Sequence, residues 1–188
     1  MRTLLNLLGH VGPLSDQLSL HIQETMPRKV CRKTEILQVP DQPTTLMYYI
    51  DSGLLKAYRY EGSREICTWF QNEGNIVMSI PSWIRGTPTE EYIEALEDSV
   101  VYTITKAELD YIYSHFPEFN FNGRVLMEQY YLMVWEWFDL VRSKRAPDRY
   151  AFFVEHFGPW VTRVPSKDIA TFLGVSKSHF SVSKRLAR

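Results

Sequence analysis

The sequence predicts an α+β fold made of an N-terminal antiparallel, jelly-roll-like β-roll, one long helix, and a C-terminal (winged) helix-turn-helix. Three observations support this prediction. Short segments rich in β-branched and aromatic residues alternate with turn signals between residues 29 and 106. A long proline-free segment of helical periodicity follows, and a basic tail with a helix-turn-helix pattern ends the sequence. The expected domains are residues 1–116, 117–145 and 146–188.

The β-roll is predicted from segments of strand length at regular spacing. Turn signals such as Asp51-Ser52-Gly53 and Glu73-Gly74-Asn75 separate these segments. Their spacing is typical of a small barrel or jelly roll, and not of alternating strands and helices. The expected strands cover residues 46–51, 54–60, 66–70, 92–96 and 100–105, and residues 1–25 are expected to form a helical lead-in.

A short helix is expected over residues 106–116, followed by the long helix over residues 119–143. Along the long helix, apolar residues recur at intervals of four and three, which is the spacing of a coiled-coil seam. We interpret this seam as the interface of a homodimer, and the alternative is a core helix within a single chain. The seam residues are Leu126, Tyr130, Met133, Trp137 and Leu140. A further helix is expected over residues 148–157, introduced by Ala146-Pro147.

The charge of the chain is divided unevenly. The net charge is −1, but residues 1–141 carry −8, while residues 142–188 contain 10 basic and 3 acidic residues. A local basic segment on an acidic body fits binding to nucleic acid, and the alternative is a solvated, charged tail. No apolar run approaches the roughly 20 residues of a membrane span, and no signal peptide is seen, so we expect a cytoplasmic protein that does not bind membranes. Cys31 and Cys67 are too far apart for a zinc-type cluster, and no metal site is expected.

The basic tail carries a helix-turn-helix pattern. Gly174 permits the left-handed backbone between two helices, and Ser176 is a suitable N-cap for the second. The buried positions are predicted to be Ile169, Ala170, Leu173, Val175 and Phe180. The alternative is an αα-corner within some other fold.

A helix-turn-helix places the start of its second helix in the DNA major groove. Side chains there would contact base edges, and cations elsewhere in the unit would contact phosphates. The candidates at the second helix are Ser176, Lys177, Ser178, His179 and Ser181. The candidates for phosphate contacts are Lys167, Lys184 and Arg185.

In outline, the chain resembles the Crp/Fnr superfamily of bacterial regulators. The resemblance rests on the order of β-roll, long helix, short helix beginning Arg149-Tyr150, and the motif Ile169-Ala170-x-x-Leu173-Gly174-Val175-Ser176. It implies a cyclic-nucleotide-binding-like β-roll, a dimerisation helix, and a helix-turn-helix that binds a palindromic site in double-stranded DNA. It also implies RNA polymerase as a partner.

The sequence departs from this family at the effector site. Members that bind cyclic nucleotides hold the phosphate with an Arg-Ser or Arg-Thr pair, and Thr89-Glu90 stands at the corresponding place here. Glu90 would repel a phosphate, so we expect no cyclic AMP binding and no cofactor, while an unknown apolar or other small effector stays open. The degenerate effector pocket is expected at Gly74, Asn75, Met78, Ser79, Thr89 and Glu90.

Two other functions were weighed against DNA binding. A cupin-type metal enzyme needs histidine ligands inside the barrel, and residues 29–106 contain no histidine, so we expect no enzyme activity. The second alternative is a ligand-binding or partner-binding module that has lost specific DNA binding. It is suggested by Val182-Ser183, because relatives commonly have Arg and an apolar residue at these positions.

Overall fold

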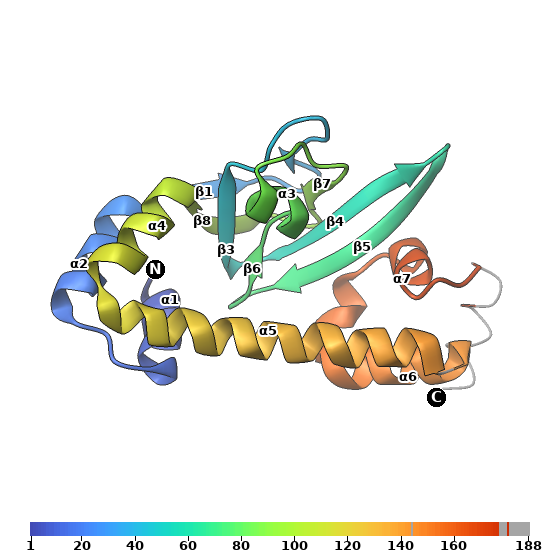
Figure 1. Cartoon of the computed structure of the whole chain (residues 1–188). Coiled ribbons are helices and arrows are strands. Elements are labelled where there is room, and N and C mark those ends of the chain that lie inside the picture. The colour runs from blue at the N-terminus through green and yellow to red at the C-terminus, as the bar shows by residue number, and fades with distance from the viewer. Residues whose placement is uncertain (144, 177–179, 181–188) are drawn as a thin grey trace. The chain divides into compact units, whose positions relative to one another are not determined.

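A computed structural model describes residues 1–143, 145–176 and 180 (Figure 1). The chain forms two compact units. The N-terminal unit consists of Met1–Ala57 and Phe70–Glu128, and the C-terminal unit consists of Tyr58–Trp69 and Gln129–Arg188. The expected domain boundaries at residues 116 and 145 do not coincide with this division, because the long helix contributes to both units.

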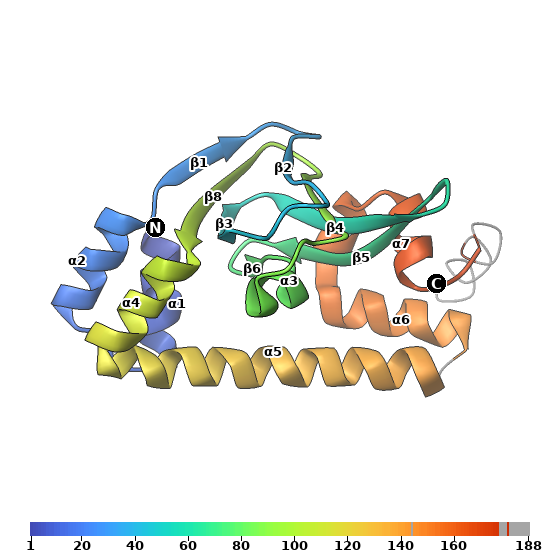
Figure 2. The same ribbon diagram turned by 45° about the horizontal axis from the view of Figure 1, so that its top comes forward.

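The β-roll consists of two four-stranded sheets with antiparallel pairing (Figures 1 and 2). The first sheet has the order β1-β8-β3-β6, with bounds Arg28–Cys31, Ser99–Thr105, Leu46–Ser52 and Ile76–Val77. The second has the order β2-β7-β4-β5, with bounds Ile36–Gln38, Tyr92–Ala95, Leu54–Glu61 and Arg64–Asn72. The predicted antiparallel β-roll is thus confirmed.

The connection between β3 and β4 shows why the chain needs glycine there. β3 pairs with β8 from Leu46 opposite Thr105 to Ser52 opposite Val100, and the register shifts just before Ser52. Gly53 follows with a φ of 109°, and a Cβ at this position would collide with Ser99 of β8. Only glycine combines this backbone angle with so close an approach of a neighbouring strand.

Helices cover one end of the β-roll in the N-terminal unit. The expected helical lead-in is two helices, α1 (Arg2–Val11) and α2 (Asp16–Thr25), and the expected short helix is α4 (Lys106–His115). The side chains of Ser15 and Thr105 cap α2 and α4 by accepting backbone N–H groups. Together with the start of α5 (Pro117–Ser143), these helices enclose one apolar core, formed by Leu4, Leu8, Leu18, Ile22, Met26, Tyr49, Ile104, Ile112 and Phe119.

The C-terminal unit is built around aromatic rings. It contains α6 (Ala146–Phe157), the short 3-10 helix η1 (Gly158–Arg163) and α7 (Ser166–Phe172). Trp137 of α5 stacks on Phe172 of α7, with ring centroids 4.2 Å apart and planes 12° from parallel. Phe153 of α6 is fully buried and lies 5.5 Å from the same Phe172 ring. Stacked and edge-on ring pairs of this kind add about 0.5–1.5 kcal/mol to the free energy gained from burial.

In the part of the chain that the structure describes, no helix is both long and apolar enough to cross a membrane. The same residues contain no group of His, Cys, Asp and Glu side chains arranged to hold a metal ion.

Candidate DNA-binding surface and effector region

The end of α7 is a tight, left-handed turn. Gly174 has a φ of 66°, its N–H donates to the Thr171 carbonyl at 3.1 Å, and the Val175 N–H donates to the Ala170 carbonyl at 3.0 Å. This pair of bonds is the Schellman motif, which ends a helix and turns the chain away from its axis. The Arg149 guanidinium of α6 donates to the Leu173 carbonyl at 2.9 Å and satisfies a further carbonyl at this helix end.

Beyond the turn, the Phe180 N–H donates to the Ser176 carbonyl at 2.8 Å, a hydrogen bond between residues four apart in the sequence. Phe180 is buried, and its ring meets the Tyr150 ring of α6 edge-on at 5.3 Å. The other positions predicted to face inward are buried as well: Ile169, Ala170, Leu173 and Val175.

The predicted DNA contacts are described only in part. Ser176 is exposed, and so is the side chain of Lys167, at 62% of its surface. The Lys167 ammonium lies 3.6 Å from a carboxylate oxygen of Glu65 and 3.6 Å from one of Asp168. The remaining predicted contacts, Lys177, Ser178, His179, Ser181, Lys184 and Arg185, lie outside the described residues.

The predicted coiled-coil seam of α5 packs against its own chain. Leu126 joins the core of the N-terminal unit, and Leu140 is buried in the C-terminal unit. Trp137 stacks on Phe172, and the Tyr130 ring lies 6.5 Å from that of Trp69. Met133, between them, is half-buried. Four of the five side chains therefore have contacts within their own chain, and their role as a dimer interface stays a prediction.

A second apolar face of α5 is open to solvent. Its members within the C-terminal unit are Tyr131, Leu132, Trp135, Phe138 and Val141, and we call this set the outer face of α5. Tyr131, Trp135 and Phe138 expose 69%, 56% and 50% of their surfaces. Spacings of four and three residues along the outer face again match a helix-pairing seam. None of these residues belongs to the seam that the sequence predicted.

The predicted effector residues are brought together only in part. The Thr89 hydroxyl donates to the Ser79 hydroxyl at 2.8 Å, and both side chains are buried. Gly74 and Asn75 lie in the turn between β5 and β6, where the Gly74 N–H donates to the Ile50 carbonyl at 2.9 Å. Met78 is half-buried, and Glu90 is exposed. The Thr89 hydroxyl thus already donates a hydrogen bond within the protein, to Ser79.

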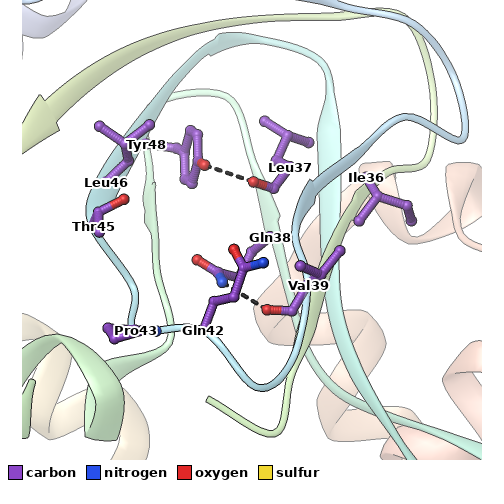
Figure 3. Close-up of a pocket in the computed structure, with 9 residues that line it drawn as sticks. All are labelled: Ile36, Leu37, Gln38, Val39, Gln42, Pro43, Thr45, Leu46 and Tyr48. Atoms are coloured by element: carbon purple, nitrogen blue, oxygen red, sulfur yellow. Dashed lines mark hydrogen bonds between the residues drawn. The ribbon is translucent and has the colours of Figure 1, made fainter. Parts of the chain in front are cut away.

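A pocket of about 340 Å³ lies instead between β2 and β3 (Figure 3). It is lined by Ile36, Leu37, Gln38, Val39, Gln42, Pro43, Thr45, Leu46 and Tyr48, and none of the predicted effector residues is among them. Figure 3 shows the Tyr48 hydroxyl donating to the Leu37 carbonyl at 2.9 Å, and the Gln38 amide donating to the Val39 carbonyl at 2.7 Å. Burial, with a smaller contribution from Cys31, raises the pKa of Tyr48 to about 12. The described lining is therefore uncharged at neutral pH.

Residues 28–116 match the cyclic nucleotide-binding domain family. No curated protein matches the chain in sequence. Solved structures do match, at low sequence identity and over nearly the whole chain.

One is a CooA mutant from Carboxydothermus hydrogenoformans, with a TM-score of 0.72 and 21% identity over 97% of this chain and 82% of that chain. Another is CLP of Xanthomonas campestris, a c-di-GMP responsive global regulator, with a TM-score of 0.71 and 15% identity over 92% and 91%. A third is a Crp/Fnr family protein from Eubacterium rectale, with a TM-score of 0.67 and 18% identity over 92% and 83%. The chain therefore has the fold of Crp/Fnr-type regulators, and its residues 28–116 match the cyclic nucleotide-binding domain family.

Proposed function

We propose that this protein is a DNA-binding transcription regulator of the Crp/Fnr type, acting as a homodimer on a palindromic site. The observation that carries the proposal is the turn after α7. A Schellman motif at Gly174 is followed by the hydrogen bond from the Phe180 N–H to the Ser176 carbonyl, and the Phe180 ring packs against that of Tyr150 in α6. These contacts support a helix-turn-helix, and they occur in a segment, residues 142–188, with 10 basic and 3 acidic residues.

The outer face of α5 supports pairing with a second copy. Trp135 and Phe138 lie 6.2 Å apart and expose half or more of their surfaces to water. A second α5 would bury these rings, and a two-fold arrangement would present two basic units about one DNA turn apart, roughly 34 Å. The interface that we propose is thus the outer face, because side chains of the predicted seam already pack within their own chain. If the protein activates transcription, it would also contact RNA polymerase.

The β-roll lacks the features that binding of a cyclic phosphate would need. The Thr89 hydroxyl is held by Ser79, and Glu90 stands exposed beside it. A cyclic phosphate placed there would meet a carboxylate and would gain no hydrogen bond from Thr89 without breaking an existing one. We therefore infer that the protein does not respond to cyclic AMP. The uncharged pocket between β2 and β3 would accept an uncharged small molecule instead.

Binding of purified protein to fluorescent genomic DNA fragments, measured by anisotropy at several salt concentrations, tests the proposal. If six phosphates are neutralised, affinity should fall about a thousandfold between 50 and 200 mM salt, because bound counterions are released. Selection from random duplexes should then return sequences with two-fold symmetry. A monomeric protein that shows no DNA binding at 50 mM salt would contradict both parts of the proposal.

The alternative to this function is a ligand-binding or partner-binding β-roll module that has kept the fold but lost DNA binding, as Val182-Ser183 suggests. Such a protein would still form dimers through α5. It would show no salt-dependent affinity for duplex DNA, so the same titration separates the two functions.

A further inference from the structure

β5 of the β4–β5 hairpin lies beside α7 within the C-terminal unit (Figures 1 and 2). The Cys67 backbone N–H donates to the Thr171 hydroxyl at 3.1 Å. The Trp69 ring meets the Phe172 ring edge-on at 5.7 Å. These two contacts hold β5 against consecutive residues of the first helix of the proposed helix-turn-helix.

The same hairpin places the carboxylate of Glu65 beside Lys167, which is a predicted DNA contact. Glu65 Oε1 lies 3.6 Å from the Lys167 ammonium, which also has Asp168 at 3.6 Å. The Glu65 side chain is 25% exposed, whereas that of Lys167 is 62% exposed, so a phosphate arriving from solvent can compete with Glu65 for the ammonium. Asp168 belongs to the same helix as Lys167 and would accompany it onto DNA. Glu65 belongs to a different element, and a DNA phosphate would have to displace it.

We propose that Glu65 is an autoinhibitory residue that occupies Lys167 in place of a DNA phosphate. This inference rests on the proposed DNA binding and adds a mechanism that limits it. A carboxylate and a phosphate oxygen are both anionic acceptors for an ammonium group, so they compete for Lys167. The contacts of Cys67 and Trp69 with α7 do not involve the cation, and they keep the carboxylate in position.

The test compares E65Q with E61Q by anisotropy on one DNA duplex at 50 mM salt. Glu61 lies on the same hairpin and is 57% exposed, but its partner is Arg59, at 2.9 Å. Both variants remove one negative charge, so a difference between them reports the surroundings of Glu65, and the K167Q background assigns it to Lys167. E65Q should bind DNA about two- to fivefold more tightly than E61Q, the range expected for exposed ion pairs. The difference should shrink as salt rises, because the Debye length falls to about 8 Å at 0.15 M.

A second pair of variants places the effect on Lys167. In a K167Q background, E65Q and E61Q should bind DNA equally, because no cation is left for Glu65 to occupy. Equal affinities in the wild-type background, or weaker binding by E65Q, would overturn the autoinhibitory role. A wild-type protein that fails to bind DNA would refute the proposed function and this inference with it. Equal melting temperatures of the variants would show that folding is unchanged.

Discussion

Replacing Trp137 or Trp135 with alanine should separate the two faces of α5. Trp137 is half-buried and stacked on Phe172 at 4.2 Å, so W137A removes packing inside one chain. Full truncation of a buried aromatic costs about 3–5 kcal/mol. For a half-buried ring that keeps some solvent contact, we expect a loss of about 2–3 kcal/mol in the free energy of unfolding. Denaturation followed by near-ultraviolet circular dichroism measures this loss.

W135A should instead weaken the dimer. Trp135 exposes 56% of its surface, which is about 110 Å² of a side chain of roughly 200 Å². Burial of that area by a second α5 would contribute at most about 3 kcal/mol per protomer, which sets a ceiling of roughly ten thousandfold on the change in the dimer dissociation constant, and we expect a rise of about a hundredfold. Analytical ultracentrifugation over a concentration series measures the constant. The assignment of the two faces is refuted if W137A dissociates the dimer with little loss of stability while W135A leaves it intact.

Three other predictions follow from single contacts. G174A should lower the free energy of unfolding by about 1–2 kcal/mol, because the φ of 66° favours glycine. The added Cβ would meet only Arg149, at an ordinary contact distance of 3.6 Å, so the cost comes from the backbone angle and not from a clash. An unchanged melting temperature would contradict the Schellman turn. S15A should cost about 1 kcal/mol at pH 7 by removing the cap of α2. The hydrogen bond from Ser15 also lowers the pKa of Glu118 in the folded protein. The stability from that bond is therefore present above the pKa of Glu118 in the unfolded chain and is lost as the pH falls through its pKa in the folded protein. A difference in stability between wild type and S15A that stays constant down to acid pH would contradict this. Cyclic AMP should not raise the melting temperature, whereas a ligand at 100 times its dissociation constant would add about 2.7 kcal/mol; a clear rise would show that a cyclic phosphate binds despite Glu90.

Strands were predictable where β-branched and aromatic residues stand between clear turn signals. β3, β4, β5, β7 and β8 lie where the sequence indicated them, within two residues at each end. β2 and β6 escaped prediction because they contain three and two residues, too few to show a period, and β1 (Arg28–Cys31) escaped because it begins with two charged residues. α3 (Ile80–Arg85) was also missed, although Pro81 at its start and left-handed Gly86 after its end are ordinary helix boundary signals.

The faces of α5 could not be assigned from sequence alone. Periodicity identifies apolar positions, and α5 has them on more than one side. The face that turns inward is set by residues distant in the chain, since Trp69 of the hairpin lies near Tyr130 and Phe172 of α7 covers Trp137. The contact of Glu65 with Lys167 escaped prediction for the same reason, because about 100 residues separate the two partners.

In the N-terminal unit, the hydroxyl groups at and near the predicted effector site form hydrogen bonds with other groups of the protein. Ser79 and Thr89 satisfy each other, and the buried Ser82 hydroxyl accepts the Thr44 N–H and donates to the Thr87 carbonyl. A ligand that drew on any of these hydroxyls would leave a buried partner unsatisfied, at a cost of about 1–3 kcal/mol.

The pocket between β2 and β3 imposes no such exchange, because the polar groups of Gln38 and Tyr48 already bond to backbone carbonyls beside it. An uncharged molecule could enter that pocket and displace water without breaking an internal hydrogen bond. This difference in cost is the reason to test uncharged small molecules at the pocket between β2 and β3 and not beside Thr89.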